Sequence, residues 1–207
     1  MSKKIDYQNE PSHLREEILK RGHITPWELF KIVSWKSAKG VAWLSLNSEA
    51  EIVKFTREAV EDLTAWSWPY GALIEGNMNY DAWTLWEEKV GQVIGADQKR
   101  SESGCATGLL RLHGVGYPVA TAILAFLKPE VFPVMDKWAV ETIFGDGASR
   151  KRWQHKAKYR EYAQLLVNPR IEDLQNVATL RGRDQKAMQL AMEKNKGSHQ
   201  NAGIPIA

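Results

Sequence analysis

The sequence predicts an all-α protein, and three observations lead to that class. Ser48-Glu49-Ala50-Glu51 has the pattern of a capping box, in which the first hydroxyl and the last carboxylate each satisfy a backbone N–H at a helix start. Apolar residues recur at steps of three and four along most of the chain, which is the period of an amphipathic helix. Finally, no Val-, Ile- or Thr-rich segment alternates with a period of two over a useful length, so no sheet is expected.

The sequence predicts at least three helices, separated by loops. A helix is expected after Ser48, with Ile52, Phe55, Ala59, Val60 and Leu63 on one face, and a second over residues 80–94. A third begins at Ser149 or a near neighbour and ends before Pro169. Loops are expected at residues 37–40, 66–79 and 95–103, and a loose tail from about residue 196.

Composition narrows the class of protein. A chain of 207 residues with 43% hydrophobic residues can bury a core, and Cys105 is its single cysteine. One cysteine excludes a disulfide scaffold and a cysteine-ligated iron–sulfur cluster within this chain. No apolar run approaches the ~20 residues that span a bilayer, and residues 1–6 lack the apolar stretch of a signal peptide. We therefore expect a cytoplasmic protein without a membrane partner.

Charge is distributed unevenly along the chain. The formal net charge is +3, but residues 1–149 carry 16 Lys/Arg against 20 Asp/Glu, and residues 150–207 carry 12 against 5. The last quarter is therefore a segment of net charge +7 on a mildly acidic body. Such a segment is either a solvated helical face or a surface for a polyanion.

The nine tryptophans divide into two expected groups. Six or seven are expected in the core, because pairs such as Trp83 and Trp86, or Trp27 and Phe30, share a face three residues apart. Trp43, Trp66, Trp68 and Trp138 lie beside loops or helix starts and are the better candidates to face a ligand.

The segment Leu112-His113-Gly114-Val115-Gly116-Tyr117-Pro118 carries the clearest motif. One helix is expected to end at Leu112 and another to begin near Pro118, whose missing N–H is not needed at a first helical position. The glycines between them allow a tight turn, and Val115 can fill the groove between the helices. Backbone N–H groups at Gly116 and the following helix start would then form an anion site. A simple glycine cap is the alternative interpretation.

Asp136 follows an apolar run and directly precedes another helical pattern. An aspartate at that position is commonly an N-cap, and nothing in its local sequence requires more.

We call Gly114-Val115-Gly116 and its flanking residues the glycine hairpin. Asp136 follows Pro118 by 18 residues, and this hairpin together with Asp136 resembles the helix-hairpin-helix DNA glycosylase superfamily, which includes endonuclease III. The likeness covers roughly residues 109–145. It implies a two-lobed all-α fold whose central domain spans residues 25–129. The second domain would combine residues 1–24 and 130–207, with the active cleft between the two.

The resemblance assigns roles to individual residues. Asp136 aligns with the catalytic aspartate, which stabilises positive charge on the deoxyribose and activates water. Gly114, Val115, Gly116 and Tyr117 would contact DNA through the hairpin. Pro118 stands where bifunctional members carry a nucleophilic lysine, so a monofunctional glycosylase without lyase activity is implied; Lys137 does not match that position.

Further contacts follow from the same likeness. The basic residues Arg150, Lys151 and Arg152 would flank the cleft and bind DNA phosphates. Tyr117, Trp138 and Trp43 are the candidates for a pocket around an extruded base. No iron–sulfur cluster is expected, although hairpin carbonyls could hold a monovalent cation. His113 and the pair Lys137-Trp138 depart from the family pattern. Trp35-Lys36-Ser37 is distinctive but has no assigned role, and a core tryptophan beside a solvated lysine is expected there.

The sequence thus predicts a monomeric base-excision enzyme that acts on double-stranded DNA with a damaged or mismatched base. Two alternatives stay open. The chain could be a non-catalytic DNA-binding protein in which Asp136 only caps a helix, or an unrelated helical protein in which Gly114 and Gly116 form only a turn.

Overall fold

The computed structural model describes residues 13–36, 38–68, 73–74, 78–95, 108–145 and 156–201, and these residues contain helices and no strand. The all-α class is confirmed for this part of the chain. The helices are α1 (His13–Arg21), α2 (Pro26–Lys36), α3 (Ala38–Leu44), α4 (Glu49–Ala65), α5 (Tyr80–Ile94), the 3-10 helix η2 (Gly108–Arg111), α6 (Tyr117–Leu127), α7 (Lys137–Phe144), α8 (Lys156–Val167), α9 (Glu172–Gln175) and α10 (Leu180–Asn201).

Local sequence signals set several helix ends. Ser48 caps α4 in a complete capping box with Glu51, as predicted. The helix predicted over residues 80–94 is α5, and Asn79 caps it by accepting a hydrogen bond from the Ala82 N–H at 2.9 Å. α8 ends at Val167, two residues before Pro169.

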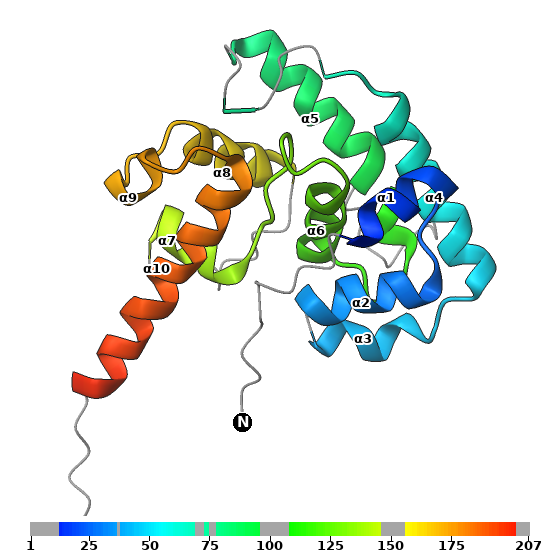
Figure 1. Cartoon of the computed structure of the whole chain (residues 1–207), viewed down its shortest axis with the longest axis horizontal. Coiled ribbons are helices and arrows are strands. Elements are labelled where there is room, and N and C mark those ends of the chain that lie inside the picture. Colours follow the sequence, from blue (N-terminus) through cyan, green and yellow to red (C-terminus); the bar gives the residue numbers. More distant parts are fainter. Residues whose placement is uncertain are drawn as a thin grey trace, which may run out of the picture.

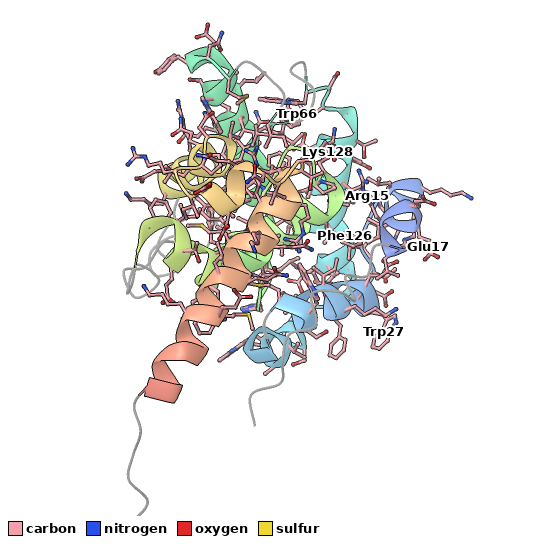
Figure 2. All side chains as sticks on the ribbon, turned by 60° about the vertical axis from the view of Figure 1, so that its left-hand side comes forward. Arg15, Glu17, Trp27, Trp66, Phe126 and Lys128 are labelled. Atoms are coloured by element: carbon pink, nitrogen blue, oxygen red, sulfur yellow. The ribbon has the colours of Figure 1, made fainter. Side chains whose placement is uncertain are left out.

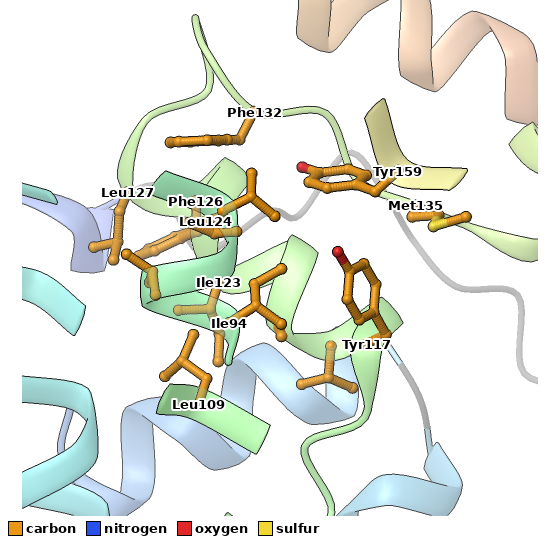
Figure 3. Close-up of a cluster of buried hydrophobic side chains, with 14 of the residues drawn as sticks. Ile94, Leu109, Tyr117, Ile123, Leu124, Phe126, Leu127, Phe132, Met135 and Tyr159 are labelled. Carbon is orange, nitrogen blue, oxygen red and sulfur yellow. The ribbon is translucent and has the colours of Figure 1, made fainter. Parts of the chain in front are cut away.

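Helix α6 lies at the centre of the molecule, with α1–α5 on one side and α7–α10 on the other (Figure 1). Ten of its eleven residues are buried, so the helix is apolar around its whole circumference. It contacts α1, α2, α5 and η2. Figure 3 shows its residues Ile123, Leu124 and Phe126 in one cluster with Phe132 and Tyr159, which lie after it in the chain.

The C-terminal helices form a second group around α7. α7 packs against α10 and also contacts α8, and α10 contacts α8 and α9. The predicted boundary between residues 129 and 130 falls in the turn after α6, and one core cluster extends across it. The two domains, 25–129 and 1–24 plus 130–207, therefore stay a prediction.

Three local expectations were wrong. Residues 38–40, predicted as loop, begin α3, and α10 continues to Asn201, beyond the start of the predicted tail. Trp27 and Phe30, expected in the core, are 62% and 38% exposed and stack on each other at the surface. Trp27 points away from the body in Figure 2. The face of α2 that enters the core instead carries Leu29, Ile32 and Val33.

The tryptophans are less buried than expected. Trp83 and Trp86 lie in the core, Trp27 and Trp43 are exposed, and Trp35, Trp66, Trp68 and Trp138 are half-buried. Trp153 lies outside the described residues. Within the described residues, no helix is both long and apolar enough to cross a membrane.

Candidate functional site

The glycine hairpin lies between η2 and α6. Gly114 has a φ of +82°, a left-handed conformation that favours glycine, and Val115 is 1% exposed, which agrees with its expected place in the groove. Gly116 is exposed and is the N-cap of α6, with Pro118 in the first turn as expected. The described residues before the hairpin form the short 3-10 helix η2 rather than an α-helix.

Asn47 fixes the outer side of this hairpin. Its amide nitrogen donates to the His113 carbonyl at 2.9 Å, and its amide oxygen accepts from the His113 N–H at 2.7 Å. The two bonds join the loop before α4 to the hairpin over 66 residues of sequence. The hairpin is therefore held from both sides, by Asn47 outside and by Val115 inside.

Asp136 is the N-cap of α7. Its Oδ1 accepts a hydrogen bond from the Trp138 N–H at 2.7 Å, and the residue is 7% exposed. The capping role that the local sequence favours is confirmed. The family resemblance implies that Asp136 lies beside an open cleft. Among the described residues the Asp136 carboxylate is instead buried.

The second oxygen of Asp136 pairs with Lys36. Lys36 Nζ lies 2.5 Å from Asp136 Oδ2, and the two side chains are 3% and 10% exposed. Lysine and aspartate are almost never buried unless they are paired, because removing each charge from water is costly. Lys36 is the last residue of α2, so the pair joins residues that lie 100 positions apart in sequence.

A second buried carboxylate, Asp184 of α10, holds the segment that leads to Asp136. It accepts hydrogen bonds from the Tyr162 hydroxyl at 2.6 Å, Arg181 Nη1 at 2.6 Å and the Val134 N–H at 3.0 Å. Burial raises the pKa of Asp184, while Arg181, these hydrogen bonds and the charge of Lys36 oppose that rise. Asp184 is thus near enough to Lys36 for their charges to interact.

Two further contacts fix the same segment. The Thr121 hydroxyl of α6 accepts a hydrogen bond from the Met135 N–H at 3.1 Å, and the Tyr159 hydroxyl donates to the Pro133 carbonyl at 2.6 Å. Burial raises the pKa of Tyr159 and of Tyr162 well above the usual 10.0. Both tyrosines are therefore neutral hydrogen-bond donors at physiological pH.

The three predicted pocket residues lie in different environments. Tyr117 is 4% exposed and packs edge-on against Tyr159, with ring centroids 5.9 Å apart, as Figure 3 shows. Trp43 is 60% exposed on α3. Trp138 is half-buried in the first turn of α7, with Lys137 Nζ 4.6 Å from its ring centroid. Of the three, Trp138 is the one whose backbone contacts Asp136.

The predicted phosphate-binding residues Arg150, Lys151 and Arg152 lie outside the described residues. Part of the basic C-terminal segment is engaged internally. Arg181 pairs with Asp184, and Arg183 donates to the carbonyls of Leu166, Val167 and Val177. The +7 charge of this segment therefore overstates the charge that it can offer to a polyanion.

Arg111 supplies an exposed cation next to the hairpin. Its guanidinium lies 4.2 Å from the ring centroid of Phe55, a cation–π contact that fixes its direction. Arg111 is not among the functional residues predicted from the sequence.

The expectation of a solvated Lys36 was wrong, since its side chain is 3% exposed and pairs with Asp136, and no role was predicted for Asp184. A signal for Lys36 is present, since Leu29, Ile32, Val33 and Lys36 fall on one helical face, and a lysine that ends an apolar stripe must find a partner when that stripe is buried. Asp184 lies in a polar stretch of α10 that offers no comparable signal.

No protein-family model, curated protein or solved structure matches this chain. Among the described residues, no group of three His, Cys, Asp or Glu side chains is placed to hold a metal ion.

Proposed function

We propose that this protein is a DNA glycosylase that hydrolyses the N-glycosidic bond of a damaged or mismatched base in double-stranded DNA. The observation that carries the proposal is the buried Lys36–Asp136 pair at the start of α7. A buried ion pair often adds no stability over well-packed apolar side chains of similar size, so stability alone does not account for this pair. In this proposal Asp136 stabilises the positive charge that develops on the deoxyribose as the base leaves.

The hairpin supplies the contact with DNA in this proposal. Gly116 is exposed at the start of α6, and the N–H groups of a helix start favour a phosphate. The Thr121 hydroxyl couples α6 to Met135, next to Asp136, so the proposed phosphate contact and carboxylate belong to one hydrogen-bonded unit. Arg111 adds a positive charge on the hairpin side. DNA phosphates would also be bound by Arg150, Lys151 and Arg152 in this proposal. The hairpin carbonyls could hold a monovalent cation.

A second candidate is a non-catalytic DNA-binding protein, and one observation favours it. Asp136 caps α7 and is 7% exposed, which suffices to explain an aspartate at this position without any chemistry.

One experiment separates the two candidates. Purified protein is incubated with duplexes that carry a panel of oxidised, alkylated, deaminated and mismatched bases, and release of the free base is measured by chromatography. The glycosylase proposal expects release from at least one duplex and a loss of at least 100-fold in Asp136→Asn. DNA binding without release from any duplex favours the non-catalytic protein.

DNA binding itself is tested at Gly116 and Arg111. A Cβ added at Gly116 would meet only Pro118 Cδ, at 3.9 Å, so Gly116→Ala should fold normally and obstruct only the approach of a phosphate. We expect weaker binding in Gly116→Ala, and in Arg111→Ala a slope of log affinity against log salt that falls by about 1. Arg57→Ala, which removes an exposed arginine of α4, is the matched control. Equal, salt-independent binding by all three variants would contradict the DNA proposal.

A further inference from the structure

We infer that Lys128, Lys89 and Arg15 bind the dianionic phosphate group of a small ligand beside Trp66, at the end of α6 that lies away from the glycine hairpin. The inference goes beyond the proposed function, which places a DNA phosphate at the start of α6. This helix has 11 residues, and a helix of that length spans about 16 Å. One phosphate group therefore cannot contact both ends of it.

Three cations from different parts of the chain meet at Trp66, the residue that ends α4. Lys128 Nζ donates to the Trp66 carbonyl at 2.8 Å and lies 5.7 Å from the centroid of the Trp66 ring. Lys89 Nζ, from α5, lies 5.9 Å from the same centroid. Arg15 Nε, from α1, donates to the carbonyl of Leu127, the residue before Lys128, at 3.0 Å. Figure 2 shows Trp66, Lys128 and Arg15 next to one another.

Two carboxylates near the cluster do not neutralise it. Glu130 Oε2 lies 3.8 Å from Arg15 Nη2, and Asp62 Oδ1 lies 3.7 Å from Lys89 Nζ. These distances are too long for hydrogen bonds. The Glu130 and Asp62 side chains are 45% and 50% exposed, so water screens their charge, whereas the Lys89 side chain is 13% exposed. Three cations face two weakly coupled carboxylates, which leaves a net positive charge.

The Lys128 ammonium can donate further hydrogen bonds. An ammonium has three N–H groups, and among the described residues Lys128 Nζ makes one hydrogen bond, to Trp66. Burial lowers the pKa of Lys128, the charge of Glu130 opposes this, and the charges of Arg15 and Lys89 lower the pKa further. The three positive charges therefore repel one another, and an anion between them would remove this repulsion.

Capping of α6 explains only part of this arrangement. Arg15 bonds the carbonyl of Leu127 in the last turn of α6, where the helix dipole favours a cation. Lys89 has no such role, because it lies within α5 and its ammonium is directed at the Trp66 ring. A cation–π contact holds an ammonium in place and leaves its N–H groups able to bind an acceptor.

The charge of the cluster indicates the class of ligand. A phosphate monoester carries about two negative charges at pH 7, whereas each phosphate diester of DNA carries one. Three cations beside two exposed carboxylates suit the dianion better. The Trp66 ring already packs against Phe132 and Trp68, so we assign it to holding the ammonium groups rather than to stacking on a base.

The test uses the full chain with inorganic phosphate as the probe. Phosphate replaces chloride at constant ionic strength and neutral pH, and binding is measured by titration calorimetry. We expect saturable binding of one phosphate per chain and a loss of affinity of about 10-fold in Lys128→Met and in Lys89→Met. Lys20→Met, at an exposed lysine of α1, is the matched control and should bind phosphate as the unaltered protein does.

A further variant should bind phosphate more tightly. Glu130→Gln removes a carboxylate that competes with the ligand for Arg15 and Lys128, so we expect an affinity about 3-fold higher. A gain in affinity cannot result from a folding defect. Absence of saturable phosphate binding by the unaltered protein, or unchanged or weaker binding by Glu130→Gln, overturns the inference.

Duplex DNA provides the second arm of the test. Unchanged duplex binding by Lys128→Met, together with its loss of phosphate binding, supports a site for a small dianion that is separate from the hairpin. Duplex binding that weakens as much as phosphate binding does would make the cluster part of a DNA interface, and this result overturns the inference.

Discussion

At the scale of single residues, a small set of buried charged side chains sets this core apart from a purely apolar one. Lys36 and Asp136 pair in the interior, Asp184 is buried where it binds the Val134 N–H, and Glu28 is 4% exposed at the start of α2. Each of these groups has charged or hydrogen-bonding partners, which offset the cost of removing it from water. Removing one member of such a pair leaves the other charge buried and uncompensated.

We predict that Asp136→Asn lowers the free energy of unfolding by about 3–5 kcal/mol, because the amide can still cap α7 but leaves the Lys36 ammonium buried without a counter-charge. Urea unfolding followed by circular dichroism measures the change. In the double variant Lys36→Met/Asp136→Asn the loss should be smaller than the sum of the two single losses. Additive losses would show that the two side chains do not interact.

The free energy of unfolding should depend on pH through the carboxylate of Glu28. Burial tends to raise its pKa, but hydrogen bonds from Arg21 and Thr25 and the charge of Arg21 lower it below the usual 4.5. Because the folded-state pKa is the lower one, its contribution is present above about pH 4.5 and is lost as the pH falls through the folded value. Glu28→Gln should cost about 2 kcal/mol at pH 7 and less at pH 3. A pH-independent loss, measured by urea unfolding at both pH values, would contradict the assignment.

At the scale of elements, the helix starts were the most predictable features. The capping box of α4 and both ends of α5 agree with the sequence because caps and periodicity are local. Which face of α2 is buried depends on contacts with α6 and α4, and for that reason the aromatic pair Trp27 and Phe30 was misplaced. Local pattern identifies a helix, whereas its partners decide how the helix is oriented.

Removing the N-cap of α5 should lower the stability of the protein. Asn79→Ala removes the acceptor for the Ala82 N–H and should cost about 1 kcal/mol, equivalent to a fall in Tm of about 2–4 °C for a chain of this size. Thermal unfolding by calorimetry measures it. Gln92→Ala, an exposed residue within α5, is the control and should leave Tm unchanged.

At the scale of the whole molecule, the site depends on contacts between distant segments. The residues before Asp136 are held by Thr121 of α6, Tyr159 and Tyr162 of α8, and Asp184 of α10. The sequence identified Asp136 and the hairpin because each lies within one continuous motif. It could not identify Lys36 or Asp184 as their partners, since 100 and 48 residues separate these positions from Asp136 and no local pattern encodes such a pairing.

Tyr162→Phe tests this arrangement. Its hydroxyl donates to Asp184 and, at 3.3 Å, contacts the Val134 carbonyl, so its removal leaves buried acceptors without that donor. We expect a loss of about 1–3 kcal/mol in unfolding free energy and a lower rate of base release, because the segment that positions Asp136 is loosened. Tyr80→Phe, at a tyrosine that is 76% exposed, is the matched control. Equal stability of the two variants would show that the network does not brace the segment.

The half-buried indole of Trp138 has a practical consequence. It lies two residues after Asp136, with a lysine ammonium against its ring. Indole emission responds to nearby charge and to water, so a ligand that separates Lys36 from Asp136 should change the fluorescence of this ring. The difference in emission between the unaltered protein and Trp138→Phe would isolate that signal from the other tryptophans. The protein would thus report occupancy of its own site in solution, without a label.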